Sequence, residues 1–132
     1  MKSVEELDVY QLTFEFTTDV YKITETFPRS ELFGLVSQMR RAVISINSNL
    51  TEGYSRGSTP DYRRFVGIAK GSAAELSYQI KISNKLGFID NNVCNNMVNT
   101  ANRINQMLSK LFKSLEQKNT KPEYRIPNTE KE

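Results

Sequence analysis

One helical face in the middle of the chain carries the side chains best suited to chemistry. At about 100° per residue, five polar side chains fall within an arc of roughly 80°. This set, here called the polar stripe, consists of Gln38, Arg41, Ser45, Asn49 and Glu52. Aligned amide, hydroxyl, guanidinium and carboxylate groups can hydrogen-bond and form ion pairs with one another. We expect the polar stripe to be largely buried, within the domain or between subunits. The alternative is a solvated flank whose spacing is incidental.

A second helical face repeats at intervals of three and four residues, apart from the main apolar face. This 68–82 face consists of Ile68, Gly71, Glu75, Tyr78 and Ile82. A glycine inside a helix costs about 1 kcal/mol relative to alanine, and close approach of another helix is the usual explanation. We therefore expect an oligomer interface here. The alternative is that a small bundle simply exposes isolated isoleucines, which is common.

The residue inventory disfavours an enzyme. The chain has no histidine, so it lacks the commonest general base and transition-metal ligand. Its single cysteine, Cys94, has no neighbouring metal-ligand residues. No glycine-rich phosphate loop follows a strand pattern. We expect no catalytic residues, no metal site and no cofactor.

Charge is unevenly distributed along the 132 residues. Residues 1–27 carry two Lys against six Asp and Glu, a net −4. Residues 28–118 carry thirteen Lys and Arg against six Asp and Glu, a net +7. A basic body permits a polyanionic partner. The candidate phosphate contacts are Arg40, Arg56, Arg63, Arg64, Lys70, Lys81 and Lys85.

Four segments of helical period must position these side chains. We expect helices over about 4–26, 31–54, 60–86 and 90–118, with Ser30 and Thr59 as N-caps of the second and third. The second includes Leu32 in its apolar face. Short connections make neighbours antiparallel, which predicts an all-α, up-down-up-down antiparallel four-helix bundle over residues 1–118.

The remaining segment and the cellular setting follow from composition. Residues 119–132 contain two prolines and alternating charge, and we expect an extended or disordered tail. No apolar run approaches the roughly 20 residues of a membrane span, and the N-terminus does not read as a signal peptide. We therefore expect a cytoplasmic protein with no membrane partner.

The stretch from about Phe16 to Gly87 contains a long, ordered set of recurring residues. They are Phe27, Pro28, Glu31, Gly34, Leu35, Gln38, Arg40, Arg41, Ala42, Ser45, Ile46, Asn49, Glu52, Gly53, Phe65, Ala69, Gly71, Ser72, Glu75 and Leu76. This set resembles the four-helix bundle proteins encoded by intervening sequences in bacterial 23S rRNA genes, and the fourth helix matches by pattern only. Asn47 and Thr51 depart from the pattern, because the family often has small or apolar residues there.

The resemblance identifies a family but no activity. The family is similar in fold to the accessory variability determinant protein of diversity-generating retroelements, a basic homopentamer that works with a reverse transcriptase and nucleic acid. The resemblance therefore implies a homo-oligomer, with a pentamer favoured, and a partner such as RNA or a nucleoprotein. The first hypothesis is a non-enzymatic oligomer that contacts RNA or a ribonucleoprotein through its phosphate backbone. The rival hypothesis is a protein–protein adaptor without nucleic-acid binding.

Overall fold

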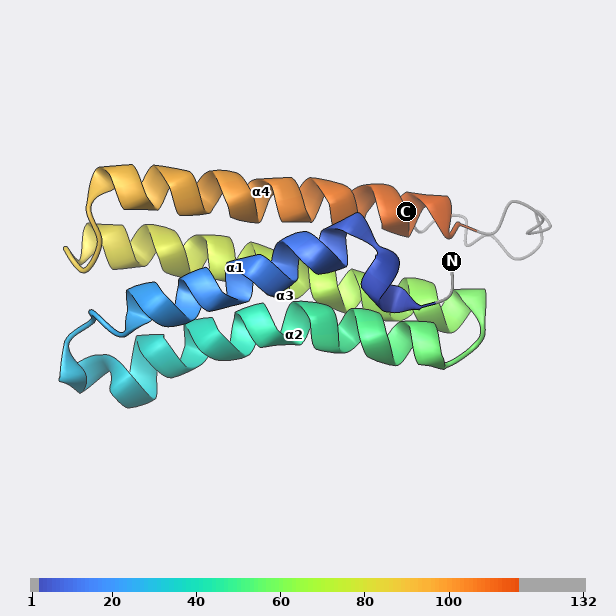
Figure 1. Ribbon diagram of the computed structural model, residues 1–132, viewed down its shortest axis with the longest axis horizontal. Coiled ribbons are helices and arrows are strands. Elements are labelled where there is room, and N and C mark those ends of the chain that lie inside the picture. Colours follow the sequence, from blue (N-terminus) through green and yellow to red (C-terminus); the bar gives the residue numbers. More distant parts are fainter. Residues whose placement is uncertain (1–2, 117–132) are drawn as a thin grey trace, which may run out of the picture.

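Four long α-helices make up most of the part of the chain that the computed structural model describes, residues 3–116. They are α1 (Asp8–Thr24), α2 (Ser37–Ser55), α3 (Thr59–Lys85) and α4 (Asn91–Ser114). No strand occurs among the described residues. The helices run side by side along the long axis of the molecule (Figure 1). The predicted all-α four-helix fold is confirmed, and the predicted tail at 119–132 lies outside the described residues.

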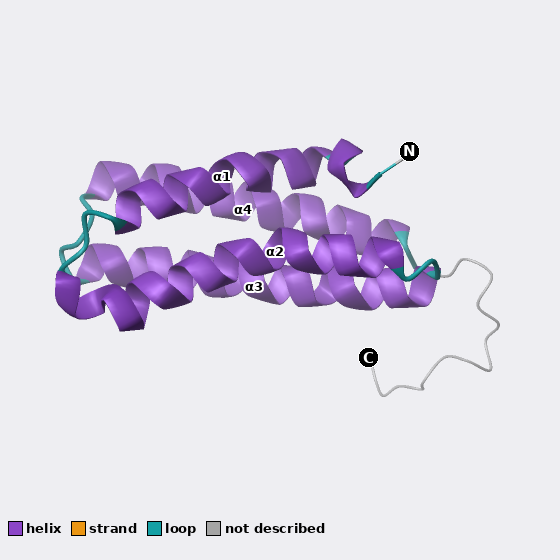
Figure 2. Ribbon diagram, turned by 60° about the horizontal axis from the view of Figure 1, so that its bottom comes forward, coloured by secondary structure: helices purple, strands orange, loops and turns teal. Residues whose placement is uncertain are grey.

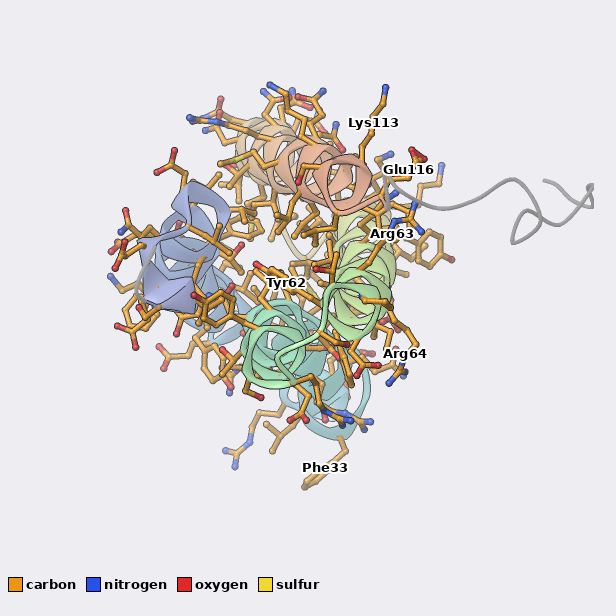
Figure 3. All side chains as sticks on the ribbon, turned by 90° about the vertical axis from the view of Figure 1, so that its right-hand side faces the viewer. Phe33, Tyr62, Arg63, Arg64, Lys113 and Glu116 are labelled. Carbon is orange, nitrogen blue, oxygen red and sulfur yellow. The ribbon has the colours of Figure 1, made fainter. Side chains whose placement is uncertain are left out.

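Successive helices run in opposite directions. The α1–α2 and α3–α4 connections lie at one end of the bundle, and the α2–α3 connection lies at the other (Figure 2). Seen end-on, the helices follow one another around a common core in chain order (Figure 3). Contacts of α3 with α2 and α4 are much more extensive than those of α1 with either of its neighbours.

Apolar side chains recurring every three or four residues build the core from all four helices. The largest fully buried side chains are Phe16, Val20, Met39, Val43, Ile46, Leu50, Val66, Leu76, Ile80, Ile104 and Leu108. Gly53 brings α2 close to α3, because a Cβ at this position would lie 2.6 Å from Cβ of Phe65. No helix in the described part of the chain is long and apolar enough to cross a membrane.

The start of the second helix differs from the prediction. A 3₁₀ turn at Arg29–Glu31 leads into a π-helical segment at Leu32–Val36, and regular α-helix begins only at Ser37. Within this segment Gly34 leaves helical geometry, with φ −109° and ψ −108°. The kink turns Leu32 outward, where it is 49% exposed. The expected Ser30 cap and the core position of Leu32 are therefore wrong.

The turns on either side of α3 each use a glycine with positive φ, Gly57 at 79° and Gly87 at 83°, a conformation that only glycine adopts without strain. Helix α3 begins one residue earlier than predicted. Ser58, not Thr59, is its N-cap, and the Ser58 hydroxyl accepts a hydrogen bond from the Asp61 amide at 3.2 Å. Capping the next helix, Asp90 Oδ1 accepts from the Val93 amide at 2.8 Å.

Candidate functional site

Most of the polar stripe faces solvent in the single chain. Gln38, Arg41 and Glu52 are exposed, and Ser45 and Asn49 are half-buried. The expectation of burial within the bundle is therefore wrong for the first three. Helix α2 turns its apolar face fully into the core, which leaves its polar flank at the rim of the α2–α3 contact. Burial between subunits stays a prediction.

The half-buried members of the polar stripe form a small hydrogen-bonded network with α3. The hydroxyls of Ser45 and Ser72 share a hydrogen bond of 2.8 Å across the two helices. The side-chain amide of Asn49 donates to the carbonyl oxygen of Ser45 at 2.8 Å and to its hydroxyl at 2.9 Å. Ser72 was not among the predicted site residues. Its sequence signals are its place beside Gly71, outside the apolar stripe of α3, and its presence among the residues that carry the family resemblance.

Glu52 pairs within its own helix rather than with Arg41. Its carboxylate lies 2.8 Å from Nε of Arg56, one turn further along α2. Both side chains are about half exposed, at 50% and 44%. Water screens such a pair, and pairs of this kind contribute about 0.3–0.5 kcal/mol to stability.

A polar groove between α2 and α3 joins the two predicted faces. Its walls include Gln38, Arg41 and Ser45 from α2, with Ser72 and Glu75 from α3. The groove therefore brings three of the five polar-stripe residues beside Glu75, the carboxylate of the 68–82 face. It holds cationic, anionic, amide and hydroxyl groups side by side, a composition suited to a polar partner surface.

The 68–82 face is open to solvent. Ile68, Gly71, Glu75 and Tyr78 are exposed, with Tyr78 at 65%, and Ile82 is half-buried. A Cβ at Gly71 would meet nothing within 4 Å. The expectation that another helix approaches Gly71 closely is therefore wrong within the chain. Contact between Gly71 and another subunit stays a prediction.

Four of the seven candidate phosphate contacts share one side of α3. At about 100° per residue they fall within an arc of roughly 60°. This basic seam consists of Arg63, Lys70, Lys81 and Lys85. Two of them border α4 directly: the Arg63 guanidinium lies 3.7 Å from the ring centre of Phe112, and the Lys70 ammonium lies 4.8 Å from it. Arg63 also donates to the Phe112 carbonyl oxygen at 3.2 Å.

The other three candidates lie elsewhere. Arg40 joins α2 to α1, because its guanidinium donates to the Thr24 hydroxyl at 3.0 Å and to the Tyr21 carbonyl oxygen at 3.2 Å. Arg56 and Arg64 both approach the Phe65 ring, at 5.0 and 4.4 Å. Figure 3 shows Arg63 on the α4 side of α3 and Arg64 on the side nearer α2.

Helix α4 extends the basic seam with residues that the sequence analysis did not select. Arg103, Lys110 and Lys113 are all exposed. The helix contains no Asp or Glu between Asn91 and Ser114. Glu116 lies just beyond its end. The α3–α4 side of the bundle thus carries seven cations, and the charge asymmetry of α4 was the available sequence signal.

An apolar surface at the kink was also missed. Phe33 is 92% exposed and points away from the bundle (Figure 3). Together with Tyr21, Leu32 and Ile44 it borders a groove between α1 and α2. We call these four residues the kink patch. Its cause is the non-helical backbone at Gly34, which no periodic pattern reveals.

Groups suited to catalysis are sparse in the described part of the chain. Tyr62 points toward the bundle axis (Figure 3), and its hydroxyl is buried without a hydrogen-bond partner among the described residues. Burial raises the pKa of Tyr62, and the neighbouring Tyr54 raises that pKa further. Residues 3–116 contain no group of three or more His, Cys, Asp or Glu side chains placed to hold a metal ion.

Comparisons with known proteins agree with the fold. The family model described as 23S rRNA-intervening sequence protein matches residues 5–110. A crystal structure of a protein of unknown function from the S23 ribosomal protein family of Bacteroides thetaiotaomicron has a TM-score of 0.73. That similarity extends over 80% of this chain and 95% of the other, at 22% identity. Comparison with curated protein sequences finds no match.

Proposed function

The chain belongs to the 23S rRNA-intervening sequence protein family, and from this premise we propose that it is a non-enzymatic, homo-oligomeric protein that binds RNA or a ribonucleoprotein through a basic surface. The observation that carries the proposal is the α3–α4 side of the bundle. There the basic seam and three cations of α4 lie together, and no carboxylate interrupts α4. Phosphate contacts of this kind supply affinity without reading sequence.

Duplex binding at varied salt tests the nucleic-acid proposal. If phosphates are the contacts, log affinity falls linearly with log salt, with a slope near 0.9 per phosphate neutralised on DNA. The variant Lys81→Glu/Lys85→Glu should weaken binding on all sequences alike and reduce the slope. Both side chains are exposed, so the fold should survive.

The matched control makes the same charge change away from the α3–α4 side. Arg29→Glu alters one exposed cation just before α2 and is compared with the single variant Lys85→Glu on α3. It should reduce binding much less than the α3 variant. Equal losses for the two variants would mean that only net charge matters. No binding by the assembled wild type at low salt contradicts the proposal.

The assembly proposal rests on the exposed 68–82 face. Ile68 and Tyr78 are large side chains that the described chain leaves 42% and 65% exposed. Closed cyclic assembly would bury that face on every copy. A pentamer is the favoured count, which corresponds to about 76 kDa from five chains of 15.2 kDa.

Light scattering at micromolar concentration tests assembly. We expect a mass near that of the pentamer, and Ile68→Asp should lower it by placing a charge in the interface. Ile44→Asp is the control, since Ile44 is equally exposed on α2. A clean monomer for the wild type contradicts the proposal.

A protein–protein adaptor is the second candidate, and the kink patch favours it. An aromatic ring as exposed as Phe33 is more typical of a partner surface than of a free one. Failure of the assembled protein to bind rRNA fragments or duplex DNA at low salt would favour this function. Under it, Phe33→Ser should abolish partner binding, while Lys81→Glu/Lys85→Glu should not.

A further inference from the structure

The exposed face of α4 is a row of uncharged amides. Five amide side chains recur at intervals of three and four residues and fall within about 80° of one another. This amide row consists of Asn92, Asn95, Asn99, Asn102 and Gln106. All five are exposed. None makes a side-chain hydrogen bond to another described residue, so their donors and acceptors are free for a partner.

Helix formation does not explain the amide row. Asparagine is less favourable than alanine inside a helix, by up to about 0.7 kcal/mol per residue, because its side chain competes for the backbone in non-helical conformations. Helix α4 nevertheless contains seven asparagines. Core packing does not explain the row either, because the buried side of α4 is built from Cys94, Met97, Ala101, Ile104 and Leu108.

Cations border the amide row on its α3 side and continue it along α4. Lys110 and Lys113 lie in the same outward arc beyond Gln106, and Arg103 lies about 20° outside that arc. Across the α3–α4 contact, the basic seam runs alongside, joined to α4 where Arg63 and Lys70 meet Phe112. The result is a strip of neutral donors and acceptors with a positive edge along α3, while its other edge faces α1, where Asp19 and Lys22 line the groove. Such a strip complements a polyanion that displays neutral polar groups beside its phosphates.

Double-stranded RNA has that chemistry. Its minor groove is wide and shallow and displays 2′-hydroxyls and base edges between two phosphate backbones. Each amide both donates and accepts hydrogen bonds, as a 2′-hydroxyl does. From Asn92 to Gln106 the amide row extends about 21 Å at 1.5 Å per residue, long enough to follow a groove. B-form DNA has a narrower minor groove and lacks the 2′-hydroxyl.

We propose that α4 lies along the minor groove of an RNA duplex, with the amide row on 2′-hydroxyls and base edges and the flanking cations on phosphates. This inference rests on the proposed nucleic-acid binding and narrows it to RNA over DNA. Cations alone would bind either duplex, because both carry phosphates. The amide row would favour RNA over DNA, because only RNA offers it 2′-hydroxyls.

Binding to RNA and DNA duplexes of the same sequence tests the inference. The wild type should bind RNA more tightly at every salt concentration. The variant Asn95→Ala/Asn99→Ala/Asn102→Ala should lower RNA affinity at least tenfold, since three hydrogen bonds at about 0.5–1.5 kcal/mol each reach that factor. DNA affinity should change less than threefold. The salt slope should stay the same, because no charge is altered.

The control removes exposed polar side chains from another helix. Ser48→Ala/Thr51→Ala/Ser55→Ala changes α2 alone, at three exposed side chains, and should leave RNA affinity as it was. Circular dichroism should show that the α4 variant is at least as helical as the wild type, since alanine favours helix.

The possible failures separate the two proposals. No binding of either duplex overturns the proposed nucleic-acid function, and the inference with it. Equal wild-type affinity for the two duplexes overturns the inference alone. So does an equal loss for RNA and DNA in the α4 variant, or an equal loss of RNA binding in the α2 control.

Discussion

At the scale of single residues, two helix glycines have opposite surroundings. A Cβ at Gly53 would meet Cβ of Phe65 at 2.6 Å and the backbone of Tyr62 at 3.3 Å, whereas a Cβ at Gly71 would meet nothing within 4 Å. Gly53→Ala should therefore destabilise the chain by about 1–3 kcal/mol through overpacking. Gly71→Ala should stabilise it by up to about 1 kcal/mol through helix propensity. Denaturant unfolding of the diluted monomer measures both, and shifts of the same sign would contradict the close α2–α3 contact.

Glu52 gives a second prediction at this scale. Because its pair with Arg56 is half exposed, Glu52→Ala should lower the free energy of unfolding by no more than about 1 kcal/mol. Glu116→Ala serves as the surface reference in the same thermal melts. A loss of about 3–5 kcal/mol would instead indicate that the carboxylate is buried against another subunit, where removing one partner of an ion pair is far more harmful.

At the scale of elements, helix caps decide where α3 begins. The Ser58 hydroxyl accepts from the Asp61 amide, so Ser58→Ala should cost about 0.5–2 kcal/mol. Thr59 is the first helical residue and is exposed, so Thr59→Ala should be near neutral. Paired urea titrations of the two variants measure the difference. If Thr59→Ala proved the more damaging, the helix would begin one residue later than described.

The segment before α2 is the other place where an element departs from its sequence pattern. The π-helical segment at Leu32–Val36 moves two apolar side chains to the surface and creates the kink patch. Single-turn π segments occur frequently at functional sites. This local geometry, rather than periodicity, sets the α1–α2 surface that the adaptor hypothesis uses.

At the scale of the whole molecule, α1 is the least attached helix. Its contacts with α2 and α4 are sparse compared with those of α3, although Val9, Phe16 and Val20 are buried. Hydrogen exchange in the diluted monomer should therefore show weaker protection in α1 than in α3, because local opening follows contact density. Equal protection of the two helices would contradict this. A gain of protection confined to α1 on assembly would assign it to the subunit interface.

The sequence alone predicts the four helices, their antiparallel order and the core seams, because apolar period and cap residues are local signals. The predicted helix bounds are wrong mainly before α1 and before α2, where Leu7 and Gly34 interrupt helical geometry. The family was also recognisable from residues of the second and third helices. The polar stripe was correctly grouped on one helix, but its burial was not predictable, since periodicity does not say how far a flank lies from the neighbouring helix.

Tertiary structure decided the rest. The Ser45–Ser72 hydrogen bond joins residues 27 apart in the chain, and the Arg63–Phe112 contact joins residues 49 apart. Helical period places each residue on a face of its own helix, but the packing of one helix on another determines which faces meet. That packing made Gly53 a contact and left Gly71 open. The same packing places the basic seam of α3 beside α4. The sequence pattern of a single helix does not indicate such a contact between helices.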